Sequence, residues 1–114
     1  MKKVDAIIRP DRFDNVAQIL EEEGYSGFTI TDVRGHGQSP EKVGEWRGQK
    51  YELHVTHKLQ ISMIVEDSEV QDVVKAIITG ARTGALGDGL VTVTDVAAVY
   101  SVRTGGLAVD TATT

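Results

Sequence analysis

The sequence repeats one pattern twice, a strand-like segment, a helical segment and a second strand-like segment, with a long irregular stretch between the two halves. Apolar residues recur at helical spacing in residues 13–20 and, more strongly, in residues 70–81. Period-two alternation of apolar and polar residues occurs in residues 3–9, 28–31, 58–65 and 91–94, and continues less regularly to Val102. This order predicts an α+β fold of the ferredoxin-like βαββαβ type, in which an antiparallel sheet carries both helices on one face.

Both predicted helices have local signals at their ends. The first follows Asp11 and Asp14, either of which could cap it, and Gly24 can close it. The second follows Ser68, which lies three residues before Gln71, the spacing of a capping box.

The sheet face that points away from the helices is predicted to be half apolar. It carries Ile7, Thr29, Thr31, Gln60, Ser62 and Ile64. A small sheet with such a face often needs a partner to cover it, so oligomerisation is one interpretation. An ordinary, partly solvated face is the other.

The composition narrows the class of protein. The 114 residues suit a single domain, and the net charge of -5 argues against a protein that wraps nucleic acid or coats an anionic membrane. No apolar run is long enough to cross a bilayer, and no signal-peptide core follows Met1. The absence of cysteine rules out disulfides and thiolate metal sites. We therefore expect a cytoplasmic protein that does not bind nucleic acid.

A long connection separates the two halves. Residues 37–57 show neither a clean strand pattern nor a clean helix pattern, and connections of this length are often functional. Trp46 lies within the connection and is a candidate anchor for another protein. Packing of Trp46 against its own domain is the alternative.

Residues 80–90 hold the densest run of glycines. Glycines let successive backbone N–H groups converge on an anion and let phosphates approach closely. The run leads from a helix to a strand, so a helix N-terminus cannot supply the positive field, and Arg82 and Arg103 are candidates to do so. A simple helix stop followed by a turn is the alternative.

A second glycine pair, Gly35 and Gly37, lies where the second predicted strand ends. In this topology the two glycine segments could border one cleft, and Lys58 at the start of the third strand could add a cation to it. The three histidines, His36, His54 and His57, lack the spacing of a metal site. No catalytic motif is present, so we do not expect an enzyme.

Several motifs resemble those of the PII nitrogen-regulatory proteins, over residues 1–105. These are the opening MKKVDAIIRP, the segment GYSGFTITDVRGHG of residues 24–37, the segment ARTGALGDG of residues 81–89 and the segment VRTG of residues 102–105. By this resemblance residues 37–57 are the T-loop and residues 82–90 the B-loop. Residues 106–114 form a C-terminal tail that carries no clear signal, and disorder is one interpretation of it.

The resemblance implies a homotrimer that binds an adenine nucleotide in clefts between subunits and contacts a membrane transporter or an enzyme through the T-loop. The implied nucleotide-binding residues are Ile7, Thr29, Gly35, His36, Gly37, Gln38, Lys58, Met63, Ile64, Gly87, Asp88, Gly89, Leu90 and Arg103.

This chain departs from the family pattern at three positions that contact polyphosphate. Leu90 replaces a basic residue, Ser101 replaces an arginine, and Gln38-Ser39 stands where family members carry Arg-Gln. Because hydrogen bonds to charged groups contribute roughly 1.5–3 kcal/mol each, these changes should weaken binding of the most highly charged ligand most. We expect ADP or AMP to be favoured over ATP.

The second effector and the modification state stay open. The family glutamine replaced by Ser39 helps to hold magnesium and 2-oxoglutarate, so 2-oxoglutarate sensing is not expected and a magnesium requirement is left open. Tyr51, with Trp46 and Arg47 nearby, matches a tyrosine that some members modify, but an unmodified partner contact is the favoured interpretation.

Other functions stay open too. One alternative is a conventional nitrogen-regulatory PII protein that senses ATP, ADP and 2-oxoglutarate, and another is a specialised regulator of bicarbonate transport. A ferredoxin-like trimer with a structural or metal-tolerance role would belong to a different class.

Overall fold

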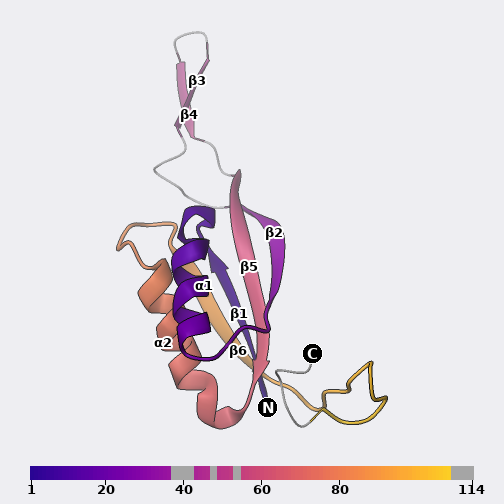
Figure 1. The fold of residues 1–114 in the computed structure, drawn as a ribbon. Helices are drawn as coiled ribbons and strands as arrows, with labels where there is room; N and C mark the ends of the chain where they lie inside the picture. The colour runs from indigo at the N-terminus through magenta and orange to yellow at the C-terminus, as the bar shows by residue number, and fades with distance from the viewer. Residues whose placement is uncertain (37–42, 47–48, 53–54, 109–114) are drawn as a thin grey trace.

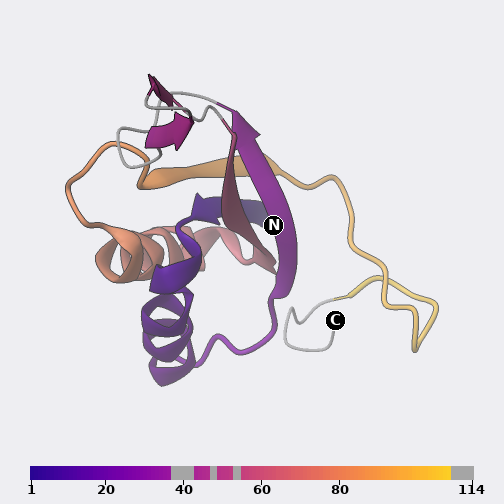
Figure 2. The same cartoon turned by 90° about the horizontal axis from the view of Figure 1, so that it is seen from above.

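The computed structural model describes residues 1–36, 43–46, 49–52 and 55–108. Four strands form an antiparallel sheet in the order β2-β5-β1-β6. Two helices pack side by side on one face of this sheet (Figures 1 and 2). The strands are β1 (Lys2–Ile8), β2 (Thr29–His36), β5 (Val55–Val65) and β6 (Gly89–Asp95), and the helices are α1 (Phe13–Glu22) and α2 (Val70–Ala81). The predicted ferredoxin-like α+β fold is confirmed.

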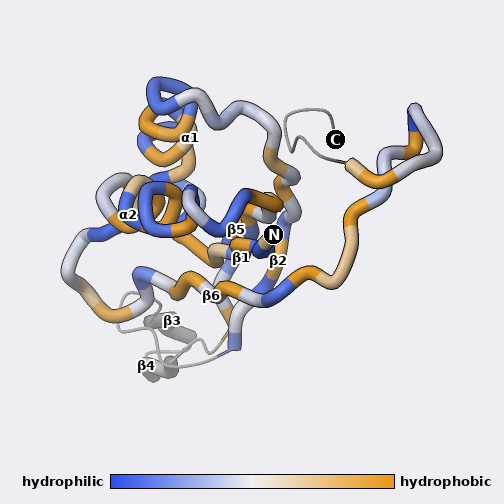
Figure 3. The backbone as a smooth tube through the Cα atoms, turned by 90° about the horizontal axis from the view of Figure 1, so that it is seen from below, coloured by the Kyte–Doolittle hydropathy of each residue, from blue (hydrophilic) through white to orange (hydrophobic). Residues whose placement is uncertain are grey.

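The core lies between the sheet and the helices. Alternate residues of β1 and β5 point into the core, and one stripe of each helix faces them. Hydrophobic and hydrophilic positions accordingly change places along these elements in Figure 3. The buried residues are Val4, Ala6, Ile8, Val16, Leu20, Ile61, Met63, Val65, Val73, Ala76, Ile77 and Ala81. Both helical stripes predicted from the sequence therefore form the core.

The two helices approach each other most closely at Gly80. A Cβ placed on Gly80 would come within 2.8 Å of the Val16 Cα and 3.0 Å of its backbone nitrogen. Only a residue without a side chain allows the α2 backbone to lie against α1 at this distance.

The helix ends differ from the prediction at two of the three ends for which a cap was predicted. Gly24 does close α1: its N–H donates to Glu21 O at 3.0 Å and the Tyr25 N–H donates to Leu20 O at 2.8 Å. The residue before α1 is Arg12, and neither predicted aspartate caps the helix. A 3-10 turn, η1 (Pro10–Arg12), leads into α1 instead.

The predicted capping box before α2 is also wrong. It joins Glu66 and Glu69 around the 3-10 turn η2 (Asp67–Glu69), not Ser68 and Gln71. The Glu66 N–H donates to the Glu69 carboxylate at 3.0 Å. The Glu66 carboxylate accepts the backbone N–H hydrogen bond that the Ser68 hydroxyl was predicted to accept in its own capping box. The capping box therefore starts two residues earlier than predicted.

Two more strands lie in the segment that showed no clean strand pattern. β3 (Val43–Trp46) and β4 (Gln49–Glu52) pair as an antiparallel hairpin beyond the ends of β2 and β5 (Figure 1). β5 starts at Val55, inside the predicted connection. Charged residues interrupt the alternation in both short strands, which explains why the pattern did not reveal them.

The last predicted strand is shorter than expected. β6 ends at Asp95, and residues 96–108, here called the C-terminal arm, extend away from the sheet (Figure 2). The arm closes on itself through a bridge between Tyr100 and Leu107. Neither α1 nor α2, the α-helices of the described residues, is long and apolar enough to cross a membrane.

The sheet face opposite the helices carries the residues predicted for it. The register pairs Ile7 with Gln60, Thr29 with Ser62, and Lys3 with Ile64. At its centre the Asp5 carboxylate accepts hydrogen bonds from the Ser62 hydroxyl and, at 3.2 Å, from Gln60 Nε2.

Candidate functional site

The B-loop folds around one carboxylate, that of Asp88. The Thr83 and Gly84 N–H groups each donate to Asp88 Oδ2 at 2.8 Å, and the Thr83 hydroxyl donates to Oδ1. The Ala85 N–H in turn donates to Thr83 Oγ1 at 3.2 Å. Backbone N–H groups therefore converge on an anion, as the glycine pattern predicts, but in this part of the loop the anion belongs to the chain itself.

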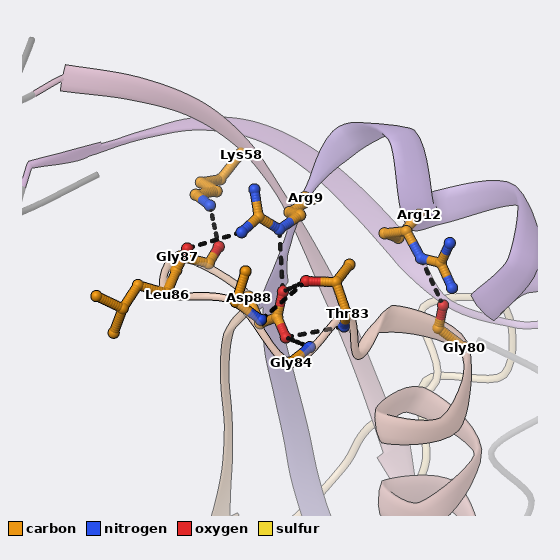
Figure 4. Close-up of polar contacts among 10 residues, drawn as sticks. Arg9, Arg12, Lys58, Gly80, Thr83, Gly84, Leu86, Gly87 and Asp88 are labelled. Carbon is orange, nitrogen blue, oxygen red and sulfur yellow. Dashed lines mark hydrogen bonds and ion pairs between the residues drawn. The ribbon is translucent and has the colours of Figure 1, made fainter. Parts of the chain in front are cut away.

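Arg9 holds the same carboxylate from the other side. Its Nε donates to Asp88 Oδ1 at 3.0 Å, and its terminal Nη2 donates to Leu86 O at 2.7 Å (Figure 4). The hydrogen bonds from Thr83, followed by those from Arg9 and Gly84, hold the pKa of the Asp88 carboxyl well below its ordinary value of 3.8. The carboxylate is therefore ionised at neutral pH.

Lys58 joins the two glycine segments. Its Nζ donates to Gly87 O, and its Cγ lies 3.7 Å from the position that a Cβ on Gly35 would occupy. Gly35 and His36 are the last residues of β2, so Lys58 lies between the end of β2 and the Gly87 turn. In the described part of the chain, Arg9 and Lys58 donate hydrogen bonds to the loop, whereas Arg82, its first residue, is exposed at the end of α2.

Three further predicted residues continue this site along β1 and β6. Gly89 pairs with Ile8, and the neighbouring Leu90 pairs with Ile7. Ile7, Gly89 and Leu90 line a hollow of about 260 Å³ beside the C-terminal half of α2. Leu90 leaves an apolar side chain 59% exposed at a position where the family resemblance implies a cation.

Thr29, Met63 and Ile64 form a separate group. They line a hollow of about 520 Å³ near the start of β2, with Lys3, Ser26, Gly27, Phe28 and Ser62. The Met63 side chain is only 5% exposed and belongs to the core. Along β5, Lys58 and Ile64 are separated by roughly 20 Å at the rise of an extended strand, so a single chain does not bring the two groups together.

Arg103 lies apart from both groups. It sits in a turn of the C-terminal arm, where the Gly105 N–H donates to Ser101 O at 2.8 Å and the Ser101 N–H donates to Gly106 O at 2.9 Å. Figure 2 shows the arm on the opposite side of the sheet from the B-loop. Within a single chain Arg103 therefore does not reach the residues around Lys58.

The remaining predicted residues belong to the T-loop. Gly37, Gln38 and Arg47 lie outside the described residues, and Trp46 and Tyr51 lie in the β3–β4 hairpin. Of the histidines, His54 lies outside the described residues. Within the described part of the chain, no group of three histidine or acidic side chains is placed to hold a metal ion.

Sequence reasoning missed Arg9 and Thr83. Arg9 is 79 residues from Asp88 along the chain, so no local pattern connects them. One signal was available: Arg9 and Pro10 directly follow the first strand, and the fold places that end of β1 beside the B-loop.

Comparison with known proteins gives one consistent result. A family model described as "Nitrogen regulatory protein P-II" matches residues 1–106. The chain is 42% identical over 105 residues to "Nitrogen regulatory protein P-II" of Microchaete diplosiphon, covering 92% of this chain and 94% of that protein. The corresponding protein of Nostoc punctiforme is 41% identical, and "Nitrogen regulatory protein P-II 1" of Escherichia coli K12 is 42% identical, with the same coverage.

Proposed function

The chain belongs to the nitrogen regulatory protein P-II family, and from this premise we propose that it is a regulator that binds an adenine nucleotide and acts on a partner protein. The observation that carries the proposal is the meeting of Lys58, Gly35 and the Gly87–Gly89 turn at one end of the strands. A cation beside backbone that carries no side chains is suited to phosphate, because charge and N–H groups can both reach the oxygens.

The nucleotide would lie between subunits of a homotrimer. The residues implied for nucleotide binding fall into separate groups, around Lys58, around Ile64 and on the C-terminal arm. A neighbouring copy could supply the groups that one protomer leaves distant, including Arg103. The arm supports assembly, since Tyr100 is 68% exposed, Leu107 62% exposed and Val102 fully exposed, and such side chains usually gain a partner. The number of subunits, three, follows from the family resemblance.

The site should favour ADP or AMP over ATP. Leu90 offers no charge to a phosphate chain, and the arm carries Ser101 where an arginine is the family pattern. Calorimetric titration of the purified protein with AMP, ADP and ATP tests this preference. We expect saturable binding in which ATP is no tighter than ADP; ATP binding far more tightly than ADP would refute the preference.

The partner would be a membrane transporter or an enzyme contacted through the T-loop. Gly35 and Lys58 lie close to the two ends of the T-loop, where it leaves β2 and enters β5. A ligand bound beside them could therefore change the order of the T-loop, as in an order–disorder switch. Pull-down with and without ADP, using a variant that lacks residues 43–52 as the control, tests whether capture requires the loop. Capture that is equal with and without these residues would contradict the proposal.

A conventional role in nitrogen signalling is the second candidate, favoured by the printed names of relatives about 42% identical to this chain. It predicts that 2-oxoglutarate, ATP and magnesium bind together. Ser39 argues against this, and titration with 2-oxoglutarate in the presence of Mg-ATP distinguishes the two. We also propose that the protein is not an enzyme. Hydrolysis of ATP above the rate in buffer alone would contradict this.

A further inference from the structure

We propose that Arg9 is a positioning residue of the nucleotide site: it neutralises Asp88 and holds the Leu86–Asp88 turn in the shape that receives phosphate. This inference rests on the proposed nucleotide binding. None of the glycine motifs or implied ligand residues singles out Arg9, and its role follows from its contacts.

Arg9 fixes the turn at two points. One nitrogen binds the Asp88 carboxylate and another binds Leu86 O two residues earlier, so the planar guanidinium bridges the turn. Arg9 follows directly on the end of β1, and its side chain is only 12% exposed. The loop is thereby attached to the sheet in addition to its covalent links to α2 and β6.

The positive charge of Arg9 also lies close to Gly87, where a phosphate group is proposed to bind. Its Nη2 lies 3.3 Å, and Lys58 Nζ 3.7 Å, from the point that a Cβ on Gly87 would occupy. Without Arg9, the Asp88 carboxylate would keep its hydrogen bonds from Thr83 and Gly84 but lose its ion pair with the guanidinium. Phosphate groups brought close to Gly87 would meet a like charge in a partly desolvated setting, and the repulsion would increase with each added phosphate.

Arg12 provides a matched control. It lies three residues further along the chain, and its Nε donates to Gly80 O at 3.1 Å, at the end of α2 rather than in the B-loop (Figure 4). Arg12→Gln therefore removes the same charge and a hydrogen bond to the neighbouring segment without touching Asp88 or the Leu86–Asp88 turn.

The test compares wild type, Arg9→Gln, Arg9→Lys and Arg12→Gln by calorimetric titration with AMP, ADP and ATP. Arg9→Gln should weaken ADP binding by roughly tenfold or more, the size expected for a lost charge-assisted contact. The loss should be smaller for AMP and larger for ATP. Arg9→Lys keeps the charge but cannot bridge the turn, and should show a smaller loss with little dependence on the number of phosphates. Arg12→Gln should stay near wild type.

Hydrogen exchange at the Thr83 and Gly84 amides provides a readout that needs no nucleotide. Arg9→Gln should speed exchange at these two amides, while exchange in β1 and α2 stays unchanged. Equal affinities of Arg9→Gln and wild type, or equal losses in the Arg9 and Arg12 variants for all three nucleotides, would overturn the inference. If the wild type binds no nucleotide, the proposed function fails, and the exchange rates still decide whether Arg9 holds the loop.

Discussion

Gly89 lies against the carbonyl oxygen of Ile7, so closely that a Cβ on Gly89 would be 1.7 Å from that oxygen. Gly89 also has a φ of 101°, a region that costs other residues about 1–2 kcal/mol. The start of β6 therefore depends on glycine both for its backbone angle and for its distance from β1.

Gly89→Ala should destabilise the fold strongly. Strain at the positive φ and overpacking of about 1–3 kcal/mol act together, so we expect a loss of about 2–5 kcal/mol in the free energy of unfolding. Urea unfolding at one fixed protein concentration measures it. Gly84→Ala is the matched control, because Gly84 has a φ of 90° but no atom within 4 Å of the added carbon. If both variants lose the same stability, the contact with Ile7 has no energetic role.

The α1–α2 contact gives a second prediction. Alanine in a helix interior normally stabilises by up to about 1 kcal/mol relative to glycine. At Gly80 the added carbon would meet the Val16 backbone at 2.8 Å, so Gly80→Ala should instead destabilise by about 1–3 kcal/mol. Thr79→Ala, at the exposed neighbouring position, should be neutral or slightly stabilising under the same thermal unfolding assay. A stabilising Gly80→Ala would show that the helices separate easily.

Stability should fall in acid partly through Asp88. The pKa of folded Asp88 lies below its ordinary value of 3.8, so the unfolded chain binds this proton more readily than the folded one. The stabilisation is fully present above the ordinary value and is lost as the pH falls below it. Asp88→Asn should therefore show a weaker decline between pH 5 and the lowest pH at which unfolding can be followed. Glu21→Gln, at an exposed position of α1, controls for general charge effects, and a decline in Asp88→Asn as steep as in wild type would contradict this assignment.

Lys58 should be required for phosphate binding. Lys58→Met keeps the length of the aliphatic chain and removes the charge beside Gly87, so ADP affinity should fall roughly tenfold. Lys75→Met, on the exposed side of α2, should change affinity by no more than about twofold. Titration at two salt concentrations adds a check, since the Lys58 variant should show less salt dependence than wild type. If Lys58→Met binds ADP as tightly as wild type, the phosphate groups do not bind beside Lys58.

Most of the fold could be predicted because its elements bury one regular face each. The alternation of Val4, Ala6 and Ile8, and the stripe that includes Val73 and Ile77, are both read directly from apolar spacing. The sequence of the β3–β4 hairpin has no regular alternation of apolar residues, so it gave no comparable signal. The cap before α2 was misplaced because two sets of polar residues, one starting at Ser68 and one at Glu66, both have capping-box spacing.

The site was predictable only where glycine marks it. Gly35 and Gly87 indicated where backbone could approach a ligand, and topology then placed Lys58 between them. The contact between Arg9 and Asp88 depends on how β1 ends relative to the B-loop, which is a tertiary property. The burial of Met63 is also a tertiary property. The family resemblance implies that Met63 binds the nucleotide, but its side chain lies in the core.

A crystal structure of the protein grown with saturating ADP tests the account most directly. We predict a nucleotide between two copies of the chain, with phosphate oxygens within hydrogen-bond distance of the Gly87–Gly89 backbone and Lys58, and Arg9 still bound to Asp88. A single copy with no nucleotide, or ADP bound away from these residues, would contradict it.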